Sequence, residues 1–230
     1  MKACLTLLLL ALTAALTHAG DIPTWPMPPM DYFLERMPTP PATGSAMDQA
    51  DLDYILVVQA AATPEQIAHA QKSVAFDVFT FSEVLGPNFT VAHYPQTAAF
   101  FKRLEVTSND VKNPIKDHYA RLRPYEAHKD LVKILVTREP NFSFPSGHAT
   151  RSWLYALVLG QLDPANRLPF LHCASQVGAD RIIGGMHYQT DVLAAHALAQ
   201  LIFDALQKDP TFLQDLNTLR AAEWKSPPAK

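Results

Sequence analysis

The sequence predicts an all-α, single-domain helical bundle. From residue 47 onward, apolar residues recur at helical spacing, beginning with Leu52, Ile55 and Leu56. No stretch has the alternation of apolar and polar residues that marks a half-buried strand, and no internal repeat is present. The chain has 230 residues, 48% of them hydrophobic, which is ample for one buried core and short for two domains.

Residues 1–19 have the features of a secretory signal peptide, so a periplasmic or secreted protein is expected. Lys2 provides the charged start, a largely apolar run covers 7–16, and residues 17–19 form a cleavage site. A retained membrane anchor is the alternative, but the run is too short to span a bilayer comfortably. No other segment approaches the ~18 uninterrupted apolar residues of a membrane helix, so no membrane anchoring is expected after cleavage.

Charge and cysteine content narrow the function classes further. Cleavage removes Lys2 and no acid, which takes the formal net charge from −3 to −4, and this mild acidity argues against a nucleic-acid-binding surface. Cys4 leaves with the signal peptide, so Cys173 remains as the single cysteine. Without an intramolecular disulfide, stability must come from the core alone.

Proline content distinguishes residues 20–46 from the helical domain expected at 47–230. Seven prolines in this stretch oppose helices and sheet ladders, so an extended arm lying across the folded body is expected. A disordered leader is the alternative for its first part. Tyr32, Phe33 and Leu34 favour packing of the remainder.

Cap and stop signals delimit the predicted helices. Thr63-Pro64 supplies a cap and a first-turn proline, and Gly86-Pro87 is a stop. Asp163 and Asp209 are each followed by proline, which again indicates a cap and a start. Helices are therefore predicted from residue 47, over 64–85, 98–104, 113–122, 146–159, 163–178, 187–206 and 209–222.

The stretch from Arg181 to Asp191 holds the residue types of a phosphate site with a nucleophile. Gly184 and Gly185 are expected to end one helix and His187 to start the next, which places Asp191 on the same helix face four residues later. An aspartate there accepts from one imidazole nitrogen and leaves the other unprotonated for attack. Arg181 and the backbone N–H groups of the helix start together form a seat for a phosphate.

The same histidine and aspartate could instead bind a metal, since carboxylates often orient metal-bound imidazoles. A metal needs further ligands, and His196, nine residues after His187, is expected to face away. Neither a metal nor another cofactor is therefore expected.

A basic pair precedes this stretch. Lys116 and Arg123 are seven residues apart, nearly two helical turns, so they are expected on one face of the predicted helix. His118 is expected to point the other way. Taken alone, such a pair is usually a solvated surface.

The third motif is Pro145-Ser146-Gly147-His148. Proline followed by serine indicates a helix start, with the N–H groups of Ser146, Gly147 and His148 free for an anion. His148 would stand beside that anion, placed for proton transfer. The alternative is a capped helix with a surface histidine.

The order Lys-x6-Arg-Pro, Pro-Ser-Gly-His and Arg-x5-His-x3-Asp resembles the signature of the type 2 phosphatidic acid phosphatase and vanadium haloperoxidase superfamily. Twenty residues separate Pro124 from Pro145, and thirty-two separate His148 from Arg181, as the signature allows. The signal peptide, the length and the lack of membrane spans resemble the secreted bacterial class A non-specific acid phosphatases. The resemblance runs from about Pro38 to the helix after Asp209, and it implies the helical fold of that superfamily.

The resemblance implies a role for each matching residue. His187 would be the nucleophile that becomes phosphorylated, Asp191 would orient it, and His148 would protonate the leaving oxygen. The phosphate oxygens would be held by Lys116, Arg123, Ser146, Gly147 and Arg181.

Asp180 departs from the family pattern, which usually has serine before the last arginine. An acid that faces the pocket would weaken phosphate binding. If it turns away, it could brace Arg181 or Lys116 instead. Both arrangements stay open at this point.

These observations predict a metal-independent acid phosphatase that hydrolyses a broad range of small-molecule phosphate monoesters through a phosphohistidine. Vanadate should inhibit it, because a five-coordinate vanadate adduct mimics the transition state. The alternative is a vanadate-dependent haloperoxidase with the same anion pocket, although those enzymes are usually much longer. A non-catalytic phosphate-binding protein is disfavoured, since pure binding needs no nucleophile. Family analogy suggests a homodimer or larger homo-oligomer.

Overall fold

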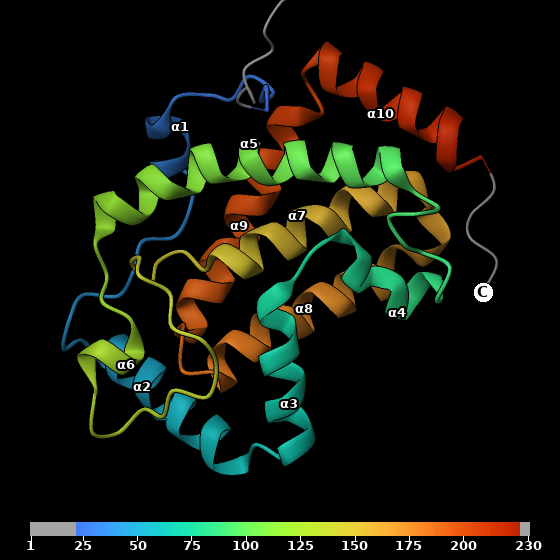
Figure 1. Ribbon diagram of the computed structural model, residues 1–230. Coiled ribbons are helices and arrows are strands. Elements are labelled where there is room, and N and C mark those ends of the chain that lie inside the picture. The colour runs from blue at the N-terminus through green and yellow to red at the C-terminus, as the bar shows by residue number, and fades with distance from the viewer. Residues whose placement is uncertain (1–21, 226–230) are drawn as a thin grey trace, which may run out of the picture.

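The computed structural model describes residues 22–225, so the predicted signal peptide at 1–19 lies outside the described residues. Between residues 22 and 225 every regular element is helical and no strand is present, which confirms the all-α prediction (Figure 1). None of the helices in this range combines the length and apolar character needed to cross a membrane.

Five of the helices in the described part of the chain form the body of the fold. α7 (Gly147–Leu162) packs against both α8 (Arg167–Ile183) and α9 (Gln189–Leu206). α5 (Pro95–Tyr119) runs across this group, with α10 (Pro210–Glu223) packed along it (Figure 1). α7 is central because the second half of its sequence is almost entirely apolar and is buried on every side.

The remaining elements cover the ends of this body. The predicted cap Thr63 accepts from Gln66 N at 3.3 Å through its Oγ1, and Ser45, which was not predicted as a cap, accepts from Asp48 N at 3.2 Å through its Oγ. These covering elements are α1 (Met30–Leu34), α2 (Ala46–Ala61), α3 (Pro64–Lys72), η1 (Ser73–Ala75), η2 (Val78–Phe81), α4 (Ser82–Leu85), α6 (Pro124–Ala127) and η3 (Pro164–Asn166).

The proline-rich segment contains one helix that was not expected. α1 occupies a stretch without proline after Pro29, so the steric bar to helix does not apply there. Phe33 in α1 and Trp25 before it are both 1% exposed.

The single helix predicted over 64–85 is wrong, because α3 ends at Lys72 and two 3₁₀ turns follow. Phe76 and Val78 are both buried, and residues two apart on one helix cannot face the same side. Asp77 Oδ1 also accepts from Phe79 N at 2.8 Å, which offers the backbone an alternative to the helix.

The two helices predicted over 98–104 and 113–122 are one helix, α5, which ends at Tyr119. Pro114 lies inside α5 without ending it, because Leu104, Val111 and Ile115 keep one face of the helix buried in the core. Ala120 then turns the chain with φ 47°. Arg123 therefore lies beyond the helix, and the prediction that it shares a helix face with Lys116 is wrong.

Candidate active site

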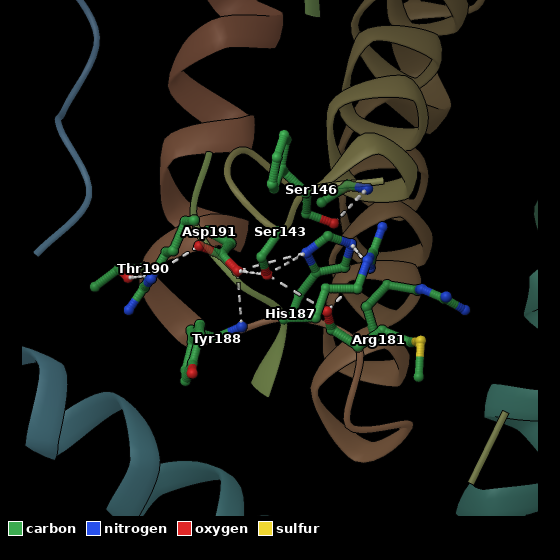
Figure 2. Close-up of polar contacts among 12 residues, drawn as sticks. Ser143, Ser146, Arg181, His187, Tyr188, Thr190 and Asp191 are labelled. Carbon is green, nitrogen blue, oxygen red and sulfur yellow. Dashed lines mark hydrogen bonds and ion pairs between the residues drawn. The ribbon is translucent and has the colours of Figure 1, made fainter. Parts of the chain in front are cut away.

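Five segments meet at one buried site: the end of α5, the residues around Arg123, the start of α7, the end of α8 and the turn before α9. Figure 2 shows the last three of them, with Ser146, Arg181 and His187 close together. The charged and polar side chains gathered there are 0–2% exposed, namely Lys116, Arg123, Ser146, Arg181, His187 and Asp191. Buried charges are costly unless they are paired, so such a cluster is typical of a binding or catalytic site.

His187 lies in the turn between α8 and α9, not at the start of a helix as predicted. Its backbone N donates to Arg181 O at 3.3 Å, and the following Tyr188 is the N-cap of α9. The shared-face argument for His187 and Asp191 therefore fails. The two side chains still meet, with His187 Nδ1 3.5 Å from Asp191 Oδ2, because Asp191 lies in the first turn of α9.

Asp191 is fixed from several directions (Figure 2). Its Oδ2 accepts from Ser143 Oγ and from Tyr188 N at 2.9 Å, and its Oδ1 accepts from Arg121 Nη1 at 2.7 Å. Ser143 Oγ also lies 3.4 Å from His187 Nδ1. The Nδ1 side of His187 therefore faces a hydroxyl and a carboxylate oxygen, both of which can accept a hydrogen bond from its N–H.

The opposite nitrogen of His187 is unprotonated. Arg123 Nη1 lies 3.1 Å from His187 Nε2, and a guanidinium can only donate, so Nε2 accepts. Complete burial, followed by the charges of Arg123 and Lys116, holds the pKa of His187 well below its ordinary value. The imidazole is thus neutral, with its proton on Nδ1 and its lone pair on Nε2.

The three cationic side chains differ in how many of their donors are used. Arg123 Nη1 also donates to Met186 O, and Arg123 Nε donates to Asn141 O at 2.7 Å. Lys116 Nζ donates to the carbonyls of Phe142 and Ser143, and burial, followed by the charge of Arg123, holds its pKa well below the ordinary value. By contrast, Arg181 Nε and Nη1 are buried without a hydrogen-bond partner among the described residues, so Arg181 has donors available for an anion.

The start of α7 supplies backbone donors, although fewer than predicted. Ser146 N donates to Asp191 O at 3.1 Å, so it is not free, and Ser146 Oγ caps the helix by accepting from Ala149 N. Within residues 22–225, the N–H groups of Gly147 and His148 have no hydrogen-bond partner. Lys112 Nζ lies 3.2 Å from the position that a Cβ on Gly147 would take, so a fourth cationic side chain contacts the first turn of α7.

His148 lies between two acceptors. Its Nε2 is 3.1 Å from Val74 O and therefore carries a proton, and its Nδ1 is 3.2 Å from Glu139 Oε1. Burial lowers the pKa of His148, and although Glu139 opposes this effect, the pKa stays below its ordinary value.

Four residues of the site were missed by the sequence analysis: Lys112, Arg121, Glu139 and Ser143. Arg121 was detectable, because it belongs to the Arg-x-Arg-Pro run with Arg123, and Ser143 adjoins the Pro-Ser-Gly-His motif. Glu139 gives no such signal, since it is a lone acid in a loop. Its carboxylate nevertheless contacts Arg123, Arg181 and His148.

Asp180 turns away from the pocket. It is fully buried, and its Oδ2 accepts from His69 Nδ1 at 2.9 Å, while its Oδ1 accepts from Gln176 Nε2 at 3.2 Å. Asp180 therefore joins α8 to α3 and braces neither Arg181 nor Lys116. Among the described residues, no group of three or more His, Cys, Asp or Glu side chains is arranged to hold a metal ion.

Comparisons with known proteins identify the family of the chain. Residues 104–207 match the model of the PAP2 superfamily. The chain is 30% identical to a non-specific acid phosphatase of Providencia stuartii over 88% of both chains. It is 31% identical to an acid phosphatase of Zymomonas mobilis over 59% of this chain and 52% of that one.

A solved structure is similar in fold. The transmembrane PAP2-type phosphatidylglycerolphosphate phosphatase from Bacillus subtilis superposes with a TM-score of 0.51 at 20% identity, over 70% of this chain and 85% of that one. The region that matches the PAP2 model, residues 104–207, contains all eight site residues predicted from the sequence, namely Lys116, Arg123, Ser146, Gly147, His148, Arg181, His187 and Asp191. The chain is therefore an acid phosphatase that belongs to the PAP2 superfamily.

Proposed function

We propose that this acid phosphatase hydrolyses a broad range of phosphate monoesters through a phosphohistidine on His187, without a metal. The observation that carries the proposal is the unprotonated Nε2 of His187, which lies 3.1 Å from a guanidinium nitrogen of Arg123. A neutral imidazole beside fixed positive charge is a nucleophile positioned to meet a phosphate.

In the first half-reaction, Nε2 of His187 attacks phosphorus and the bond from phosphorus to the ester oxygen breaks. His148 gives its proton to that departing oxygen. Arg123, Arg181 and Lys116 offset the charge on the equatorial oxygens, together with the N–H groups at the start of α7. Ser143 and Asp191 hold the Nδ1 proton and so keep Nε2 directed at phosphorus.

In the second half-reaction, a water attacks phosphorus and the bond from phosphorus to Nε2 breaks. The water's proton passes to His148, which returns to its starting state as inorganic phosphate leaves. The buried cations supply the positive charge that a metal supplies in other phosphatases, so activity should survive prolonged chelation. Vanadate should compete with substrate, because its adduct with His187 would resemble the five-coordinate transition state.

A vanadate-dependent haloperoxidase is the alternative, since vanadate would bind the same cations. The identity to acid phosphatases over most of the chain favours hydrolysis. Peroxide-dependent halide oxidation after addition of vanadate would favour the alternative. The features of residues 1–19 support a periplasmic or secreted location for the enzyme.

The intermediate can be tested by rapid quench and mass spectrometry under conditions that spare phosphohistidine. The native enzyme should carry phosphate on His187, and His187→Ala should carry none and have no turnover. His118→Ala is the matched control, because His118 is exposed on α5 and should leave both readouts unchanged. An adduct that persists in His187→Ala, or activity that vanishes on chelation and returns with added zinc or magnesium, would refute the proposal.

A further inference from the structure

The carboxylate of Glu139 contacts the groups that the proposed mechanism reserves for phosphate. Its Oε2 accepts from Arg123 Nη2 at 2.8 Å. Its Oε1 accepts from Arg181 Nη2 at 2.8 Å and lies 3.2 Å from His148 Nδ1. These three partners come from three separate parts of the chain, and Glu139 bridges all of them.

The chemistry of these contacts is that of anion recognition. Guanidinium groups bind carboxylate and phosphate oxygens with the same charge-assisted geometry. The N–H groups of Arg123 Nη2 and Arg181 Nη2 that bind Glu139 cannot bind a phosphate oxygen at the same time, although Arg181 Nε and Nη1 have no partner among the described residues. Glu139 and a phosphate therefore compete for these two N–H groups, and their negative charges repel each other in the same pocket.

The loop that carries Glu139 is held by contacts that do not involve its carboxylate. Tyr125 Oη donates to the backbone oxygen of Glu139 at 3.1 Å, and the backbone oxygen of Asn141 accepts from Arg123 Nε at 2.7 Å. The Glu139 side chain is 23% exposed, so it borders solvent on one side. Rotation about its side-chain bonds is enough to carry the carboxylate outward while the backbone stays in place.

We propose that Glu139 is an internal competitor for the phosphate subsite, displaced by the phosphate group of the substrate and returning when product leaves. The proposal rests on the proposed function, since it concerns the same pocket. While Glu139 is bound, it neutralises buried guanidinium groups that would otherwise be unpaired. The consequence is a lower apparent affinity for phosphate, reduced by the fraction of molecules in which the pocket is open. Singly charged ligands should be rejected more strongly than phosphate dianions.

The test is the affinity of the whole protein for inorganic phosphate, measured by titration calorimetry at one fixed pH. Glu139→Gln removes the competing charge and should bind phosphate about tenfold or more tightly than the native protein. Glu139→Asp keeps the charge but has a shorter reach, so it should show a smaller gain. It also provides a second variant if the first does not fold.

Glu223→Gln is the matched control. The Glu223 carboxylate accepts hydrogen bonds from backbone N–H groups in the first turn of α5, those of Gln96 and Thr97, at 2.8 Å each. Lys116 lies at the other end of α5, about 30 Å away along the helix. Glu223→Gln should lower stability and leave phosphate affinity unchanged.

The outcomes separate the competitor role from the phosphate pocket itself. Tighter binding in Glu139→Gln, with a thermal midpoint that is lower without phosphate and rises further with it, would support the competitor. Equal or weaker binding in folded Glu139→Gln would overturn it, because Glu139 would then only support the pocket. If neither the native protein nor Glu139→Gln binds phosphate, the pocket assignment fails and the competitor fails with it.

Discussion

Two histidines with the same intrinsic chemistry have different surroundings in this pocket. His187 is completely buried and faces guanidinium and ammonium groups, so its neutral form is favoured. His148 lies between a backbone carbonyl and the carboxylate of Glu139, which both accept hydrogen bonds. The hydrogen-bond partners thus leave a lone pair on Nε2 of His187 and surround His148 with acceptors for its N–H groups, while burial lowers the pKa of both histidines.

These surroundings predict the pH dependence of activity. His148 must be protonated to act as acid, and its pKa lies below the ordinary ~6.5, so kcat/KM should fall as pH rises through that lowered pKa. Burial and the charges of Arg123 and Lys116 hold the pKa of His187 well below its ordinary value, so His187 stays neutral on the acid side and the maximum should lie below neutrality. A profile of kcat/KM against pH measures both the fall on the alkaline side, assigned to His148, and the fall on the acid side, assigned to His187. A rate that still climbs at about pH 9 would contradict the roles.

The two histidines should also differ in how their loss depends on the leaving group. His148→Ala should slow hydrolysis of alkyl phosphates by roughly 10²–10⁴-fold, because a basic alkoxide cannot leave unprotonated. A nitrophenyl ester should lose less, since its leaving oxygen needs little help. His187→Ala should abolish turnover with both. Single-turnover phosphorylation of His148→Ala measures the first step alone, and an equal loss on both esters would remove His148 from the acid role.

At the scale of elements, the turn between α8 and α9 positions the nucleophile. Gly185 has φ 75°, and a Cβ there would lie 2.2 Å from Lys133 O. Leu135 N donates to Gly184 O at 3.2 Å, so the loop that carries Glu139 packs directly on this turn. The turn and the loop are therefore one unit, and a change in either should move His187.

Gly185→Ala should therefore destabilise the protein and reduce kcat together. The positive φ costs about 1 kcal/mol for a residue with a Cβ, and overlap with a neighbouring backbone adds about 1–3 kcal/mol. Gly44→Ala is the matched control, because Gly44 has φ 76° with nothing within 4 Å of its Cβ position. The control should lose about 1 kcal/mol and keep its activity. Urea unfolding and kcat measure both effects, and equal losses in the two variants would exclude the packing argument.

Sequence reasoning predicted the helical class correctly and proposed residues that the structure brings into one pocket, but it did not show how the chain brings them together. Lys116 and Arg123 meet because the chain turns at Ala120, a left-handed residue that no local preference marks. His187 meets Asp191 through a turn and not along a helix face. Glu139 was not predicted, because its contacts with Arg123, Arg181 and His148 arise from the tertiary fold and the spacing of residues in the sequence gives no sign of them.

At the scale of the whole molecule, the proline-rich segment is part of the core. Trp25 packs 5.0 Å from Phe100 of α5 and 5.2 Å from Phe212 of α10, measured between ring centroids. Its indole N–H donates to Asp215 Oδ2 at 3.0 Å, and the guanidinium of Arg103 lies 4.1 Å from its ring. One side chain thus joins the segment before α1 to two helices far along the chain.

Trp25→Ala should lower the free energy of unfolding by about 3–5 kcal/mol, the usual cost of removing a fully buried large aromatic side chain. Trp25→Phe keeps a ring between α5 and α10 and loses mainly the bond to Asp215, so it should cost only about 1–2 kcal/mol. Both variants should keep native kcat while folded, because the contacts of Trp25 do not include any residue of the pocket. Urea titration gives the midpoint and the slope, and an unchanged slope shows that stability alone has moved. If Trp25→Ala unfolds at the native midpoint, the segment lies on the body without belonging to its cooperative unit.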